Sequence, residues 1–128
     1  MNNEIIKWNP KISNFPKTIY IEGLYDDYEG FRILVKGGDP SQMYKIVFDN
    51  YLGYRNFDEG ERIKSFDSYP ANSQEWCLFI SKDSKFIDWV IDESEGFVSK
   101  DNVIHFHIIT PNDVIEVLSY EEPKIEQL

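Results

Sequence analysis

The feature of this chain that most suggests chemistry is the spacing of its two histidines. His105 and His107 stand two residues apart in the apolar run VIHFHII. Residues two apart on a β-strand point to the same face, so the two imidazoles could share a metal ion. Glu116, on the strand expected to pair with this run, could supply a third ligand. Strand pairing alone accounts for two half-buried imidazoles, however, so we predict no metal and no cofactor.

The other patterns associated with catalysis are weak or missing. The single cysteine, Cys77, lies inside the apolar run WCLFI, where burial raises the pKa of a thiol and leaves it unreactive. The chain contains no Gly-x-Ser-x-Gly elbow, Walker loop or dinucleotide-binding fingerprint. The sequence Gly37-Gly38-Asp39 is followed by no helical pattern, so a tight connection between strands explains it better than a phosphate loop. The sequence therefore predicts a binding protein and not an enzyme.

Carboxylates interleaved with aromatic residues form the strongest candidate for a binding surface. One cluster is the sequence YDDYE at residues 25–29, between two expected strands. A second lies on an expected helix, where Asp88 and Asp92 are one turn apart. Such surfaces suit a positively charged protein partner, whereas a solvated face that only maintains solubility is the alternative. The predicted partner-binding residues are Tyr25, Asp26, Asp27, Tyr28, Glu29, Asp88, Asp92 and Glu95. Tyr51, Tyr54 and Arg55 could extend this surface, although the two tyrosines fit the core or its rim better.

The net charge points to the same kind of partner. The chain carries 13 Lys and Arg against 23 Asp and Glu, a formal net charge of −10 at pH 7. Almost all of the excess lies in the second half, because residues 1–64 contribute −1 and residues 65–128 contribute −9. A field of this sign speeds association with basic surfaces. It disfavours nucleic acid as a direct ligand, because phosphate binding needs clustered Lys and Arg.

Alternating patterns predict that strands position most of these residues. In YKIVFD, residues 44–49, apolar side chains occupy the even positions, as in a strand with one buried face. Residues 31–36 form a second strand, and the turn formers between the two predict an antiparallel hairpin. The sequence TPND predicts a second hairpin between residues 103–109 and 114–118. Further strands are expected at residues 18–24 and 76–80.

One amphipathic helix is expected at about residues 83–95, with Asp83 as its N-cap and Gly96 near its C-terminus. Its apolar face would consist of Phe86, Ile87, Val90 and Ile91. Residues 59–66 could form a short helix or an irregular loop. The predicted fold class is α+β: a single domain over residues 1–128, mainly an antiparallel sheet of about six strands with at least one packed helix.

The chain length and the N-terminal sequence predict how the protein folds and where in the cell it is found. A chain of 128 residues buries roughly two-thirds of its unfolded surface, so it can fold without disulfides or a structural metal. The N-terminal sequence MNNEII lacks the basic start and apolar run of a signal peptide, and no apolar stretch reaches the ~20 residues of a spanning helix. We expect a cytoplasmic protein that does not enter a membrane.

The second half of the chain resembles a known class of proteins. The resemblance rests on FIDW at residues 86–89, IHFHI at 104–108, NDVIEVLS at 112–119 and the acidic EEP at 121–123, with IVF at 46–48 and YRNFDE at 54–59 upstream. It spans residues 30–123 and is similar to small acidic bacterial immunity proteins of polymorphic toxin systems. The resemblance implies a role as an inhibitor that binds and neutralises one cognate toxin domain, and it implies no particular site residues.

Three functions therefore remain open on the sequence. The leading prediction is an immunity-type protein whose acidic, aromatic-containing surface binds a basic toxin domain, such as that of a nuclease. The first alternative is a small metal-binding protein or metal-dependent enzyme built on His105 and His107. The second is a structural homo-oligomer formed by pairing of edge strands.

Overall fold

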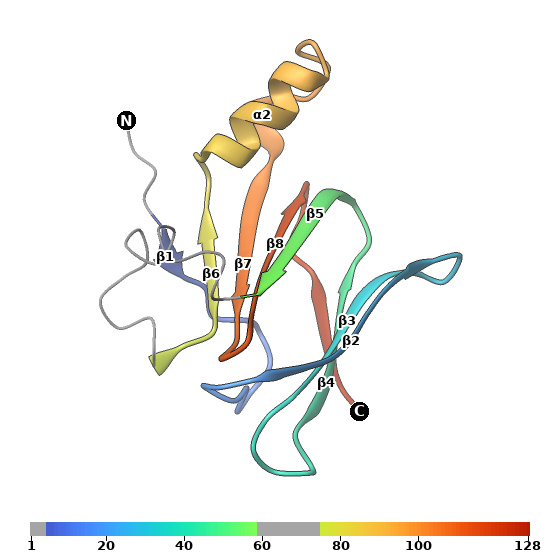
Figure 1. The fold of residues 1–128 in the computed structure, drawn as a ribbon, viewed down its shortest axis with the longest axis vertical. Coiled ribbons are helices and arrows are strands. Elements are labelled where there is room, and N and C mark those ends of the chain that lie inside the picture. The colour runs from blue at the N-terminus through green and yellow to red at the C-terminus, as the bar shows by residue number, and fades with distance from the viewer. Residues whose placement is uncertain (1–4, 59–74) are drawn as a thin grey trace.

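Two antiparallel sheets carry most of the described chain, which comprises residues 5–58 and 75–128 of the computed structural model (Figure 1). The five-stranded sheet has the order β1 (Ile6–Lys7), β6 (Leu78–Ser81), β7 (Ile104–Ile109), β8 (Asp113–Ser119) and β5 (Tyr51–Asp58). The four-stranded sheet has the order β2 (Tyr20–Asp27), β3 (Gly30–Lys36), β4 (Met43–Phe48) and β9 (Lys124–Gln127). One α-helix, α2 (Lys85–Glu93), and a short 3-10 helix, η3 (Lys100–Asn102), complete the described elements.

The predicted α+β class with about six strands is correct only in part. Within residues 5–58 and 75–128 the domain has nine strands and one α-helix, so it is mostly β. The strands that were not predicted are β1, β5 and β9. β1 has two residues and β9 has four, too few to display a period, and β5 is interrupted by a register shift between Tyr51 and Gly53. The short helix or loop expected at residues 59–66 lies outside the described ranges.

Both predicted hairpins are present. β3 and β4 pair antiparallel, from Phe31 opposite Phe48 to Lys36 opposite Met43. Their connection is closed by hydrogen bonds from Gly37 N to Gln42 O at 2.8 Å and from Gln42 N to Asp39 O at 2.8 Å. The pair of glycines at 37 and 38 is therefore part of a strand connection, as predicted. β7 and β8 form the second hairpin, in which Ile109 lies opposite Val114.

The main hydrophobic core lies between the two sheets. Tyr44, Ile46 and Phe48 alternate along β4 and are all at most 2% exposed, as the period-two pattern predicts. From the other sheet, the Phe106 ring packs against Phe48 with centroids 5.5 Å apart. β7 and β8 are buried on both faces, because the side chains that point away from this core are covered as well. The outward face of the five-stranded sheet therefore has a second buried layer.

Helix α2 covers part of that outward face. Ile87 packs with Val98, Val103 and Leu118 in a second apolar cluster, and the predicted apolar residues Phe86, Val90 and Ile91 border it. The helix begins one residue later than predicted, since its N-cap is Ser84, whose Oγ accepts a hydrogen bond from Ile87 N at 3.1 Å. Asp83 instead forms an ion pair with Lys100 at 2.8 Å.

The C-terminal end of α2 differs slightly from the prediction as well. The C-cap is Ser94, and Gly96 follows two residues later with φ +85°, a conformation that glycine adopts without strain. Within the two described ranges, no helix has both the length and the apolar character needed to cross a membrane.

Candidate functional site

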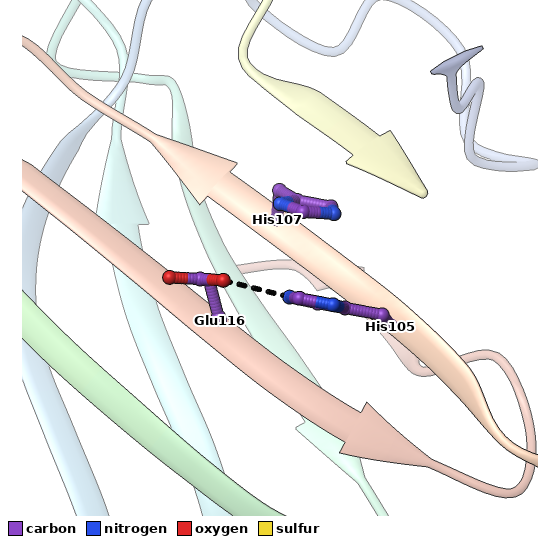
Figure 2. Close-up of side chains that lie close together, drawn as sticks. All are labelled: His105, His107 and Glu116. Atoms are coloured by element: carbon purple, nitrogen blue, oxygen red, sulfur yellow. Dashed lines mark hydrogen bonds and ion pairs between the residues drawn. The ribbon is translucent and has the colours of Figure 1, made fainter. Parts of the chain in front are cut away.

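A cluster of polar side chains is buried on the outward face of the five-stranded sheet. His105 and His107 on β7 and Glu116 on β8 are 2%, 3% and 2% exposed. In the sheet register His107 lies directly opposite Glu116, which places all three on one face, as the spacing predicts. The two imidazole rings stack with centroids 4.0 Å apart and planes inclined by 12°, and Glu116 reaches from the neighbouring strand to His105 (Figure 2).

Glu116 accepts hydrogen bonds from a cationic neighbour, Arg55, and from an imidazole, that of His105. Arg55 on β5 donates from Nε to Oε2 at 3.0 Å and from Nη2 to Oε1 at 2.9 Å, in a bidentate ion pair. His105 Nε2 lies 2.8 Å from Oε1. An ionised carboxylate can only accept, so the proton of this last bond belongs to His105 Nε2. The buried carboxylate is therefore held by one guanidinium and one imidazole.

Two serines hold the imidazole rings. Ser84 Oγ lies 2.7 Å from His105 Nδ1, and Ser81 Oγ lies 3.0 Å from His107 Nε2. Because Ser84 is also the N-cap of α2, the His105 ring connects the helix directly to the sheet. Phe86 on α2 stands with its ring nearly perpendicular to the His105 ring, at 79°.

The sequence predicted part of this cluster and missed the rest. The proximity of both histidines to Glu116 follows from the β7–β8 hairpin, whose turn residues fix the register. Arg55 was expected at the partner-binding surface and instead turns toward Glu116, with its guanidinium 4.3 Å from the centre of the Phe86 ring. The roles of Ser81 and Ser84 had no local signal, because each depends on the packing of β6 and α2 against β7.

The first predicted acidic cluster lies at the tip of the β2–β3 hairpin. Tyr28 is 96% exposed there. Arg32 pairs with Asp27 at 2.8 Å and with Glu29 at 3.2 Å, and its hydrogen bond lowers the pKa of Asp27. Asp26 accepts a hydrogen bond from the hydroxyl of Tyr51 at 2.6 Å, which raises the pKa of that hydroxyl to about 12. All three carboxylates of the hairpin tip therefore have partners within the protein.

The second predicted acidic cluster surrounds an exposed tryptophan on α2. Trp89 is 58% exposed, and Phe97, just beyond the helix, is 91% exposed. Lys100 approaches Asp88 at 3.9 Å but lies closer to Asp83. No other ion pair within 4.0 Å involves the acidic residues of this cluster among residues 5–58 and 75–128. We call these residues the α2 surface: Asp88, Trp89, Asp92, Glu93, Glu95 and Phe97.

The two clusters do not form one continuous surface. Figure 1 shows α2 beyond the ends of β6 and β7, whereas the tip of the β2–β3 hairpin projects from another side of the molecule. The two clusters also belong to different sheets. Helix α2 packs on the five-stranded sheet, whereas the β2–β3 hairpin lies at one edge of the four-stranded sheet.

Cys77 lies in the core between the sheets. The residue is 1% exposed, and burial raises the pKa of its thiol to about 12. The prediction that Cys77 is buried is therefore confirmed, and the raised pKa of its thiol agrees with the expected low reactivity.

Comparison with protein-family models, curated proteins and solved structures finds no match to this chain. The function must therefore be argued from the geometry of these sites.

Proposed function

We propose that this protein is an immunity-type inhibitor that binds and neutralises a basic toxin domain through the α2 surface. The observation that carries this proposal is the environment of Trp89. Its side chain is more than half exposed on a short helix, where Asp88 precedes it and Asp92 and Glu93 follow at the three- and four-residue spacing of neighbours on a helix surface. An exposed tryptophan side chain leaves apolar surface in contact with water. Burial of that surface against a partner would be favourable.

The chemistry of the α2 surface fits a basic partner. Tryptophan is among the residues that most often dominate the binding energy of interfaces, and Phe97 supplies a second exposed aromatic ring. The surrounding carboxylates repel acidic partners and steer basic ones, so they raise the association rate at low salt. The cleft of a nuclease, which is basic because it binds phosphates, has the required sign.

The α2 surface is favoured over the hairpin tip because its charges are less compensated. Arg32 pairs with both Asp27 and Glu29 at the hairpin, whereas among residues 5–58 and 75–128 the acidic residues of α2 form a single ion pair, from Lys100 to Asp88 at 3.9 Å. A partner therefore gains more from contact with α2. Tyr28 at the hairpin tip would contribute only where a large partner reaches both sides of the molecule.

The buried cluster supports a binding role over a catalytic one. His105, His107 and Glu116 are at most 3% exposed, which leaves a substrate little access to the groups that could perform acid–base chemistry. Their hydrogen bonds to Ser84, Ser81 and Arg55 connect α2, β6 and β5 to β7 and β8. We assign this cluster the task of holding α2 in position.

The proposal is tested by capture of the partner with matched charge variants. The protein is used as bait in extracts of its source organism, with washes at high salt, and captured proteins are identified by mass spectrometry. The α2 variant carries Asp88→Lys and Asp92→Lys. The control carries Glu122→Lys and Glu126→Lys, an equal change of net charge at exposed residues away from α2.

We expect wild type and control to recover a protein whose terminal domain kills cells when expressed alone and is harmless when co-expressed with the bait. The α2 variant should recover at least tenfold less and give no protection. Equal recovery and equal protection by all three proteins would remove the α2 surface from the interface. Capture of a protein without toxicity would contradict the immunity function itself.

A further inference from the structure

The buried cluster on the outward face of the sheet has the composition of a metal site. One ligand atom from each of His105, His107 and Glu116 lies within 4.8 Å of those of the other two. We propose that these three residues bind a divalent transition-metal ion of the zinc class. This inference does not depend on the proposed inhibitor function.

The ligand set is one that zinc uses, and its atoms lie close enough together for modest side-chain adjustment to bring them around one ion. Two imidazole nitrogens and one carboxylate oxygen form a His2Glu set, which leaves one tetrahedral position for water. Metal–ligand distances of about 2.0–2.2 Å place neighbouring ligand atoms about 3.3 Å apart. His105 Nε2 and Glu116 Oε1 are 2.8 Å apart, so an ion would have to open this pair by only about half an ångström.

The hydrogen bonds around the cluster prepare the rings for this role. Metal-bound histidines usually bond through their second ring nitrogen to a polar group that fixes the ring plane. Ser84 Oγ occupies that place at His105 Nδ1, at 2.7 Å, and leaves Nε2 directed at Glu116. Ser81 Oγ holds the His107 ring at 3.0 Å. The parallel stacking of the rings keeps both in reach of the carboxylate (Figure 2).

Metal binding requires movement of the proton that His105 Nε2 now donates to Glu116. The ion replaces the proton that Nε2 donates to Oε1, and a change of tautomer transfers this proton to Nδ1. Ser84 Oγ can then accept it in addition to the hydrogen bond from Ile87 N. His105 remains neutral, as a metal-bound imidazole must.

Arg55 is the competitor for the same carboxylate. Its Nη2 donates to Oε1 at 2.9 Å, the oxygen that faces His105. Because the Arg55 side chain is 38% exposed, its whole guanidinium can turn toward solvent and release both oxygens of Glu116. The positive charge of Arg55 nevertheless opposes the ion, so removal of this charge should strengthen metal binding. A cluster held together by hydrogen bonds alone would show no such gain.

Metal binding is tested on the full chain, produced without a histidine tag and stripped with a chelator. Co²⁺ is the spectroscopic probe, because it gives visible absorption bands in a tetrahedral nitrogen and oxygen site, and Zn²⁺ is then added as competitor. We expect one equivalent of Co²⁺ with bands that Zn²⁺ abolishes. The bands should be absent in His107→Ala, and Ser84→Ala should bind about tenfold more weakly.

The control variants separate this site from surface carboxylates. Arg55→Gln should bind Co²⁺ more tightly than wild type, whereas Glu126→Gln should bind it equally well. Absence of the bands from both wild type and Arg55→Gln, with circular dichroism spectra that show both proteins to be folded, would overturn the proposal. Bands that persist in His107→Ala would overturn it as well, because the ion would then lie elsewhere.

Discussion

At the scale of single residues, Glu116 connects the parts of the buried cluster. It is 2% exposed, and its two oxygens accept from Arg55 and His105. A buried carboxylate is tolerated only where partners replace the water that it has lost. The connection reaches through His105 to Ser84, and therefore to the first turn of α2. The position of α2 thus depends on a side chain that is itself buried.

This dependence leads to a prediction for stability. Glu116→Gln should lower the free energy of unfolding by about 2–4 kcal/mol, because Arg55 and His105 lose a charged acceptor in a buried setting. Urea unfolding followed by circular dichroism measures this loss. The matched control is Glu126→Gln, at an exposed carboxylate with a long ion pair to Lys45 at 3.8 Å. It should change the free energy by no more than about 0.5 kcal/mol. Equal effects of the two substitutions would contradict the assigned role of Glu116.

The thiol of Cys77 provides a second prediction at this scale. Because burial raises its pKa from 9.0 to about 12, the native protein should not react with a disulfide reagent at pH 8, and labelling should require unfolding. Rapid stoichiometric labelling without denaturant would contradict the position of Cys77 in the core.

The raised pKa of the Cys77 thiol also predicts the direction in which the free energy of unfolding changes at alkaline pH. The unfolded thiol ionises near pH 9, whereas the folded thiol stays protonated until about pH 12. The associated stability is therefore complete below pH 9 and is lost as the pH rises toward 12. The free energy of unfolding should fall more steeply over this interval for wild type than for Cys77→Ala.

At the scale of elements, two adjacent residues at the N-terminus of α2 have different roles, although both are of types that often cap helices. Ser84 caps the helix and also bonds His105, whereas Asp83 pairs with Lys100. Ser84→Ala should therefore cost about 1–2 kcal/mol and reduce the helical signal. Asp83→Ala should cost less than about 1 kcal/mol, because it removes only a partly exposed ion pair. Chemical denaturation of both variants checks this order, and the reverse order would show that the helix begins at Asp83.

Prediction from sequence succeeded where the information is local. Both hairpins have periodic strands and turn formers between them, and the β7–β8 hairpin places Glu116 near the histidines. It failed where the determinant is distant. Arg55 meets Glu116 only because β5 pairs with β8, between residues 61 apart in sequence. The strand β9 is recognisable only by its pairing with β4. No local pattern indicates either pairing.

At the scale of the whole molecule, charge and exposed aromatic rings are distributed unevenly. The half of the chain after residue 64 holds −9 of the net charge of −10, and it includes the whole α2 surface. The hairpin tip belongs to the first half, where Arg32 pairs with both Asp27 and Glu29. The α2 surface holds four of the carboxylates of this acidic half together with the exposed ring of Trp89.

The most direct test of this account is photochemical cross-linking from position 89 in cells of the source organism. The benzophenone amino acid p-benzoylphenylalanine replaces Trp89 in one protein and Leu128, which is similarly exposed at 61%, in the control. The account predicts a covalent adduct with a toxic domain from position 89 and none from position 128. An adduct from position 128 alone, or none from position 89 in cells where the wild-type bait recovers the toxin, would contradict it.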